Sequence, residues 1–276
     1  MSTTFFYILV FIFGTIVGSF LNVVILRYNT GVSIARGRSF CFSCGRKLGP
    51  LELIPVLSFF LQGGKCIGCE SKISWQYPVV ETLTGLLFVG VFANYLGLIG
   101  LYFDTWYVLI SLIIMAVLMA ITVYDMRHKI IPDGLVITFG ALALLKIVAD
   151  FFLMNSTSGE IKTHVIWFLL AGPVLALPFF LIWLFSKGRW MGLGDPKLIL
   201  GIGWFLGPVF GLSAIILAFW SGALYGLALM ILSKFSWHGL KIDGKTEVPF
   251  APFLILGFLL VYFFGFDVLG LGFLIP

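Results

Sequence analysis

The four cysteines of the chain fall into two closely spaced pairs, Cys41-Phe42-Ser43-Cys44 and Cys66-Ile67-Gly68-Cys69. Each CxxC turn offers two thiolates, and four sulfurs about 2.3 Å from one ion make a closed tetrahedral zinc site. Gly45 after the first pair and Gly68 inside the second suit tight knuckle turns. Because four sulfurs leave no position for water, we expect structural rather than catalytic zinc. Disulfides, which a reducing cytoplasm disfavours, and free thiols, which need no paired spacing, are the alternatives.

Two aspartates stand where apolar segments meet polar sequence. Asp125 ends a long apolar stretch, and Asp195 ends the sequence Gly192-Leu193-Gly194-Asp195. Two glycines before an aspartate indicate a place where backbone or substrate approaches closely. Asp125 could instead pair with Arg127 or Lys129, and Asp195 could cap a helix that starts at the following proline.

A pair formed by Asp125 and Asp195 would have a definite chemistry. Two carboxyl groups a few ångströms apart at a partly dry site cannot both ionise, so they share one proton. One group then acts as a base toward water, while the other acts as an acid and polarises a scissile carbonyl. That is peptide hydrolysis without a metal or a covalent intermediate. It requires the helix that ends near residue 125 to lie beside the helix that starts near residue 195.

The elements that must position these groups belong to a membrane protein. The 276 residues are 61% hydrophobic and 11% charged, which excludes an ordinary soluble domain, a disordered chain and a disulfide scaffold. We predict an all-α integral membrane protein with about eight transmembrane helices, because a span needs about 20 mostly apolar residues. The predicted spans are residues 4–26, 78–99, 105–124, 134–153, 164–186, 198–210, 211–232 and 250–272.

Two features describe how these spans are connected and packed. Gly207-Pro208 divides the stretch from Leu198 to Ser233 and predicts a tight helical hairpin, with a single kinked helix as the alternative. Glycines spaced by four residues, such as Gly14 and Gly18, permit close helix packing in lipid. We expect the chain to divide into a first helix (1–27), a loop with the four cysteines between the first two spans (28–77) and a membrane core with both aspartates (78–276).

The basic residues predict the orientation. All 17 except Lys146 and Lys162 fall in the first, third, fifth and seventh loops or at their edges. The positive-inside rule therefore places these loops in the cytoplasm and both termini on the outer side. The net charge of +5 is explained by this orientation, so we expect a lipid bilayer and no nucleic acid as a partner.

The motifs, taken in order, resemble those of the type IV prepilin peptidases. They are Gly18-Ser19-Phe20-Leu21-Asn22-Val23-Val24-Ile25 with Arg27, Arg38-Ser39, the two CxxC pairs, Leu53-Ile54-Pro55-Val56-Leu57-Ser58, Tyr77-Pro78-Val79-Val80-Glu81, Asp125, Ile131-Pro132-Asp133, the GxGD motif at 192–195 with Lys197, and Val248-Pro249-Phe250-Ala251-Pro252-Phe253. The resemblance covers nearly the whole chain. Departures fall at Glu52, at Gln62-Gly63 and at Ala251, and we expect none of them to touch the chemistry.

The resemblance implies a bifunctional enzyme of the bacterial inner membrane. Asp125 and Asp195 would be the catalytic pair, and Gly192, Gly194 and Lys197 would support the catalytic loop. The substrates would be prepilins and pseudopilins of type IV pili and type II secretion, cut after a glycine on the cytoplasmic side. The enzyme would then methylate the new N-terminal amine with S-adenosylmethionine, and the four cysteines match the bifunctional members.

The methyl-donor site is not identified by the sequence. No glycine-rich dinucleotide fingerprint is visible, so we expect the donor where the zinc loop meets the helix that begins near Glu81. Glu81 could instead be a carboxylate that the helix dipole favours, and Asp133 a helix-start cap.

Three other functions compete with this interpretation. A transporter is disfavoured because no carboxylate lies in the middle of a span and no inverted repeat is obvious. A presenilin-like intramembrane protease also uses a GxGD aspartate, but the zinc loop does not fit that class. A non-catalytic scaffold that binds a partner through the zinc loop predicts that Asp125→Asn is harmless.

Overall fold

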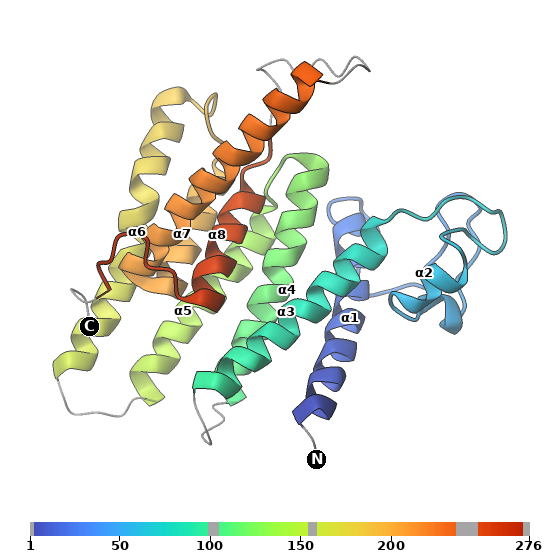
Figure 1. The fold of residues 1–276 in the computed structure, drawn as a ribbon, viewed down its shortest axis with the longest axis horizontal. Helices are drawn as coiled ribbons and strands as arrows, with labels where there is room; N and C mark the ends of the chain where they lie inside the picture. Colours follow the sequence, from blue (N-terminus) through green and yellow to red (C-terminus); the bar gives the residue numbers. More distant parts are fainter. Residues whose placement is uncertain (1–2, 99–104, 154–158, 236–247, 273–276) are drawn as a thin grey trace. The chain divides into compact units, whose positions relative to one another are not determined.

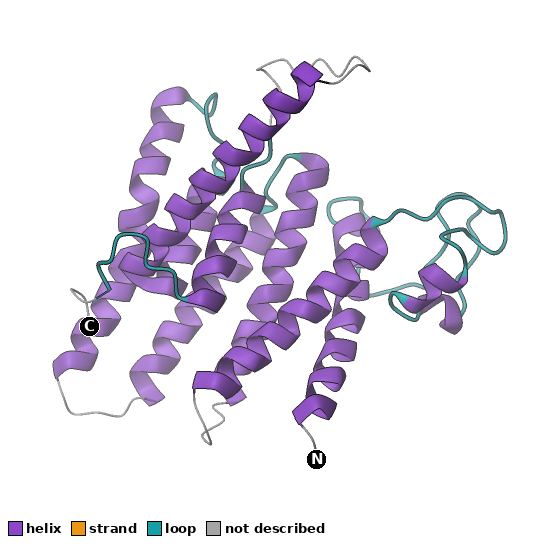
Figure 2. Ribbon diagram, in the orientation of Figure 1, coloured by secondary structure: helices purple, strands orange, loops and turns teal. Residues whose placement is uncertain are grey.

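The computed structural model describes residues 3–98, 105–153, 159–235 and 248–272, and within these ranges the chain is helical apart from its loops (Figure 1, Figure 2). The helices are α1 (Thr3–Arg27), η1 (Pro50–Leu53), α2 (Leu57–Leu61), α3 (Gln76–Leu98), α4 (Thr105–His128), α5 (Asp133–Leu153), α6 (Gly159–Ser186), α7 (Gly194–Phe235) and α8 (Ala251–Phe264). Extended pairing in the described part is limited to two isolated bridges in the cysteine loop, Phe40 with Lys47 and Lys65 with Lys72.

The expectation of an all-α membrane protein is confirmed. Among the described residues, six helices are long and apolar enough to cross a membrane, namely α1, α3, α4, α5, α6 and α7, and α8 is a shorter apolar helix. The cysteine loop lies between α1 and α3, as predicted. Lys241 and Lys245, which contributed to the predicted orientation, lie outside the described residues.

Helix α7 contains the predicted hairpin. Gly207 has a non-helical backbone, with φ 80° and ψ −174°, and Pro208 follows it. A Cβ built on Gly211 would lie 3.4 Å from the Cα of Gly203. Eight positions of a straight helix span about 12 Å, so the chain must reverse between these two glycines. Both arms of the hairpin are helical, so each of the eight predicted segments contains a helix.

The last predicted span was too long. Helix α8 ends at Phe264 rather than near residue 272, because Gly265 adopts the left-handed conformation with φ 63° and donates its N–H to the Val261 carbonyl at 2.8 Å. Glycine is the residue that most easily ends a helix in this way.

The chain divides into two compact units, residues 1–123 and 124–276, and each is described by itself. In the first unit α1 packs closely against α3. A Cβ on Gly14 would lie 2.7 Å from the Cα of Gly85, and a Cβ on Gly18 would lie 2.7 Å from the Cα of Glu81. The predicted role of these glycines in close packing is therefore confirmed.

In the second unit α7 packs against α5, α6 and α8. Fully buried side chains from these helices, among them Phe139, Ile199 and Phe258, form its core. The unit boundary falls inside α4, so Asp125 belongs to the second unit together with Asp195. This unit positions both aspartates.

Candidate active site

Asp125 lies in the last turn of α4 and is only 3% exposed. Its carboxylate accepts a hydrogen bond from the backbone N–H of Ala251, the first residue of α8. Its Oδ2 atom is buried and has no partner among the described residues, so the alternative of an ion pair with Arg127 or Lys129 gains no support at that oxygen. A buried carboxylate oxygen without a partner is unusual and is a mark of a functional site.

Asp195 lies in the first turn of α7 and is 9% exposed. Its carboxylate accepts the backbone N–H of Gly192, upstream in the chain, whereas a helix cap would accept an N–H further downstream. The carboxylate also interacts electrostatically with that of Asp125. The structure therefore brings the two predicted aspartates close together, from the end of one helix and the start of another.

The two glycines of the GxGD sequence have different surroundings. A Cβ on Gly194 would lie 2.6 Å from the Cβ of Ile131, so a side chain at 194 would push the start of α7 away from the loop before α5. The nearest atom to a Cβ on Gly192 is Oδ2 of Asp195, at 3.9 Å. Neither glycine has a positive φ. Close approach, rather than an unusual backbone conformation, explains the glycine at 194.

An ion pair of Lys197 links the start of α7 to the start of α5. Its Nζ atom lies 2.6 Å from Oδ1 of Asp133, the first residue of α5. Asp133 is largely exposed, and its side chain forms this ion pair at the start of α5. The ion pair and the contact between Gly194 and Ile131 both fix the start of α7, which carries Asp195.

Ala251 was not predicted to lie at this site. It is one of the departures from the family that we expected not to touch the chemistry, yet its N–H binds Asp125. The backbone makes the contact, so the exchange of side chain does not remove it. A contact between residues so distant in sequence has no local signal.

The four cysteines form one cluster in the loop of the first unit. Their sulfurs all lie within 4.8 Å of one another, and no disulfide joins them. The sulfurs of Cys41 and Cys69 are 3.8 Å apart, which matches the edge of a tetrahedron whose centre lies about 2.3 Å from each sulfur. A disulfide would need about 2.05 Å. The donor set and its spacing therefore fit a zinc ion.

Matching turns hold the two cysteine pairs. The N–H of Gly45 bonds to the carbonyl of Cys41 at 2.8 Å, and the N–H of Glu70 bonds to that of Cys66 at 2.9 Å. Gly45 and Glu70 both have positive φ, at 71° and 56°. Gly68 does not, so its predicted role in the turn was wrong. A Cβ there would lie 3.0 Å from Nε of Arg46, and the glycine leaves room for that side chain.

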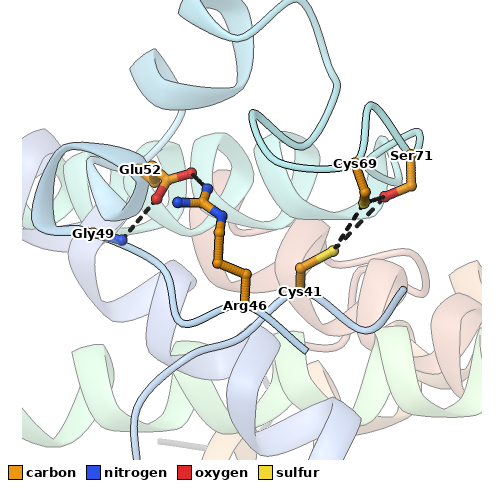
Figure 3. A network of polar contacts seen from close by, with 6 residues as sticks. All are labelled: Cys41, Arg46, Gly49, Glu52, Cys69 and Ser71. Atoms are coloured by element: carbon orange, nitrogen blue, oxygen red, sulfur yellow. Dashed lines mark hydrogen bonds and ion pairs between the residues drawn. The ribbon is translucent and has the colours of Figure 1, made fainter. Parts of the chain in front are cut away.

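Figure 3 shows polar contacts in the cysteine loop, at the sulfurs of Cys41 and Cys69 and between Arg46, Glu52 and Gly49. The hydroxyl of Ser71 lies 3.1 Å from the sulfur of Cys69 and 3.7 Å from that of Cys41. Arg46 forms an ion pair with Glu52, and Glu52 accepts the N–H of Gly49 at 2.8 Å. These contacts brace the first cysteine turn against the segment that follows it.

The thiols of the cluster differ in acidity. The backbone N–H groups of Cys44 and Ser43 lower the pKa of Cys41 to about 6. At Cys44 the N–H of Arg46 is outweighed by the neighbouring sulfurs of Cys69 and Cys41, which raise the pKa to about 11. Four thiolates at this spacing repel one another, so a bound cation is what would let all four ionise together.

Two family models match the chain. The bacterial peptidase A24 N-terminal domain matches residues 12–95, which include the four cysteines, and the type IV leader peptidase family matches residues 112–227, which include both aspartates. A prepilin leader peptidase/N-methyltransferase of Bacillus subtilis strain 168 is 30% identical over 95% of this chain and 96% of the relative. The chain belongs to the type IV leader peptidase family.

Further relatives bear the same name. Those of Legionella pneumophila and Pseudomonas aeruginosa are each 29% identical, over 96% and 88% of this chain and 94% and 85% of their own length. The comparison with solved structures gave no match. The predicted family is confirmed, and with it a multi-pass membrane enzyme, a peptidase with methyltransferase activity.

Proposed function

We propose that Asp125 and Asp195 form the catalytic pair that removes the leader peptide of prepilins and pseudopilins, by cleavage after a glycine at the cytoplasmic face of the membrane. The observation that carries this proposal is that one unit brings two buried carboxylates together, each held by a backbone N–H, with the charge of Asp125 acting on the carboxylate of Asp195. Their burial and mutual repulsion favour one shared proton.

The shared proton assigns complementary roles to the two groups. The ionised carboxylate takes a proton from a water molecule as that water attacks the scissile carbonyl, and the protonated one donates its proton to the carbonyl oxygen. The tetrahedral diol then collapses: the carboxyl that took the proton from water gives it to the leaving nitrogen as the C–N bond breaks, and the other carboxylate takes back a proton from the diol, which restores the pair. The N–H of Ala251 and that of Gly192 orient the two carboxylates throughout. Oδ2 of Asp125, which has no hydrogen-bond partner among the described residues, would hold the proton or bind the water. Apparent acid constants measured for this reaction would belong to the pair.

Residues around the pair set its position. Gly194 lets the start of α7 approach Ile131, and Lys197 binds Asp133. We propose that these contacts, with Gly192, hold Asp195 at the distance from Asp125 that hydrolysis requires. A displacement of about 1 Å costs an enzyme about 100-fold in rate.

We assign the second activity, methyl transfer to the new N-terminus, to residues 28–77. Cys41, Cys44, Cys66 and Cys69 would hold a structural zinc ion that keeps this loop folded, since so short a loop cannot build a core of its own. S-adenosylmethionine, when bound, supplies an electrophilic methyl group for the new N-terminal amine. No residue is assigned to binding this donor.

The enzyme would lie in the bacterial inner membrane with its catalytic side in the cytoplasm and both termini in the periplasm. The concentration of basic residues in four loops supports this orientation. A prepilin would then present its leader on the side where Asp125 and Asp195 lie at their helix ends.

The test is cleavage of a purified prepilin in detergent by wild type, Asp125→Asn and Asp195→Asn, with Glu70→Gln as a carboxylate-to-amide control in the cysteine loop. Each aspartate variant should lose at least about 1,000-fold in cleavage rate, because acid–base catalysis of this kind depends on both groups. The double variant should be no slower than either single one. Cleavage by either single variant at the wild-type rate would refute the assignment.

A further inference from the structure

A strained turn stands in the middle of the cysteine loop. Val56 has φ 61° and ψ −53°, and the N–H of Leu57 bonds to the carbonyl of Pro55 at 2.6 Å. This is a γ-turn of the rare, strained form. A β-branched residue at positive φ is an outlier, and such strain persists only where surrounding contacts enforce it.

The contact that enforces the turn comes from Glu81 on α3. The N–H of Val56 donates to Oε2 of Glu81 at 2.6 Å, and the hydroxyl of Ser19 on α1 bonds to the same carboxylate. Glu81 is 6% exposed. Glu81 takes part in none of the ion pairs within the described ranges, which are Arg46–Glu52, Lys146–Asp150 and Lys197–Asp133. The hydrogen-bond donors to its carboxylate are therefore neutral groups. Hydrogen bonds to an ionised carboxylate are among the strong ones.

The helical pair holds this carboxylate rigidly. A Cβ on Gly18 would lie 2.7 Å from the Cα of Glu81, so α1 and α3 touch at this level. One turn away, the buried Asn22 donates to the carbonyl of Tyr77 at 3.3 Å and accepts from Gln76 at 3.4 Å. Glu81 is therefore a fixed point to which the loop is tied.

From the turn, contacts lead to the cysteines. Helix α2 follows Val56 directly, and its Phe59 packs against Trp75 with ring centres 4.8 Å apart and the ring planes tilted by 57°. A Cβ on Gly64 would lie 3.2 Å from the ring of Phe59, and the carbonyl of Gly64 accepts the N–H of Ile73 at 2.8 Å. Gly64 lies two residues before Cys66. The orientation of the turn thus determines where the second cysteine pair is held.

We propose that Glu81 is a positioning residue for methyl transfer: its carboxylate holds the strained turn at Val56 and so fixes the cysteine loop against α1 and α3. This inference rests on the proposal that the loop serves methyl transfer. It differs from the role of a helix N-terminal carboxylate, because the partner is the backbone of a distant loop. Leader cleavage does not depend on it.

The experiment compares wild type with Glu81→Gln, Glu81→Leu, Val56→Gly and Glu81→Leu/Val56→Gly, all as full-length enzyme in detergent. Methyl transfer to a pilin whose leader has already been removed gives kcat and KM, and leader removal from an intact prepilin is followed in parallel. Zinc content and the rate of proteolysis within residues 50–75 report the state of the loop. Leu61→Ala is the control in the same loop, because Leu61 is 74% exposed and lies outside both cysteine turns.

Glu81→Leu should lower kcat for methyl transfer at least tenfold, with cleavage within twofold of wild type and faster proteolysis of the loop. Glu81→Gln, which keeps an oxygen acceptor, should lose less. Val56→Gly should restore much of the lost activity in the Glu81→Leu background, because glycine adopts φ 61° without help. A role of Glu81 in general stability would not produce this rescue.

Three results would overturn the inference: normal methyl transfer by Glu81→Leu, loss of cleavage together with methyl transfer, or a double variant no better than Glu81→Leu. Cys66→Ser separates this inference from the proposed function. Normal methyl transfer by Cys66→Ser would overturn the role of the loop itself. Impaired transfer in Cys66→Ser with normal transfer in Glu81→Leu would overturn only the role of Glu81.

Discussion

The cysteine loop and the aspartate pair place their reactive groups by opposite means. The cysteine sulfurs come from one loop, two of the four residues are exposed, and short turns with hydrogen bonds and one surface ion pair hold the loop. The aspartates come from two helices far apart in sequence and are buried beside a packed core. We therefore expect the loop to need a bound metal ion to complete its structure, whereas the aspartate site is held by helix packing together with the N–H of Gly192 and the ion pair between Lys197 and Asp133.

This difference decides which perturbation reaches which activity. Metal ions and solvent have access to the exposed cysteines, so we expect them to change the loop and to leave the aspartate site unaffected. Steric changes between helices, in contrast, act on the aspartates directly. Variants that act on one region at a time test this difference.

Removal of the metal should have the largest effect. A chelator, or Cys66→Ser, should convert the loop from protease-resistant to protease-sensitive and abolish methyl transfer, because metal binding supplies most of the folding free energy of such small sites. Metal analysis should give one zinc per wild-type chain and none in the variant. Retention of methyl transfer after complete loss of zinc would show that the loop does not depend on metal.

Gly194→Ala should have the next largest effect, on cleavage. Its Cβ would meet that of Ile131 at 2.6 Å, so the start of α7 must shift and carry Asp195 with it. We expect a loss of about 100-fold in kcat for leader removal. Gly192→Ala meets nothing nearer than 3.9 Å and should lose much less. Equal losses in the two variants would contradict this reading of the GxGD turn.

Much of this arrangement could be predicted from the sequence, because its signals are local. The spacing of the cysteines indicates a metal site and long apolar stretches indicate helices, so the cysteine cluster and a helix in each of the eight segments could be predicted. The N–H of Ala251 on Asp125 and the bond between Val56 and Glu81 were not. Both join residues far apart in sequence, and tertiary packing alone decides them. The role of Gly68 was predicted wrongly for a related reason. The side chain that needs the space at Gly68 is that of Arg46, which lies beside the other cysteine pair and is distant in sequence.

Gly18→Ala should have a moderate effect on stability. A Cβ there would lie 2.7 Å from the Cα of Glu81, a backbone atom that cannot turn aside. Overpacking of this kind costs about 1–3 kcal/mol, so the thermal midpoint in detergent should fall. Gly226→Ala is the matched control, because its Cβ would meet nothing within 4 Å and alanine favours a helix. A midpoint for Gly18→Ala at or above that of wild type would contradict the packing of α1 on α3.

Glu52→Gln should have the smallest effect. The N–H of Gly49 and the guanidinium of Arg46 lower the pKa of Glu52 in the folded loop. The carboxylate therefore stabilises the loop fully above the ordinary glutamate pKa of about 4.3, and this contribution is lost as the pH falls through the lowered value. At pH 6 the variant should be digested slightly faster than wild type, and the difference should vanish at lower pH. A difference that grows on acidification would have the wrong sign.

The most direct test of the division between the two regions is one mass measurement on two substrates, an intact prepilin and a pilin whose leader has already been removed. Asp195→Asn should leave the intact prepilin uncut and still add the 14 Da of a methyl group to the processed pilin, whereas Cys66→Ser should remove the leader and add no methyl group. Failure of Asp195→Asn to methylate the processed pilin, or failure of Cys66→Ser to cut the prepilin, would contradict the account.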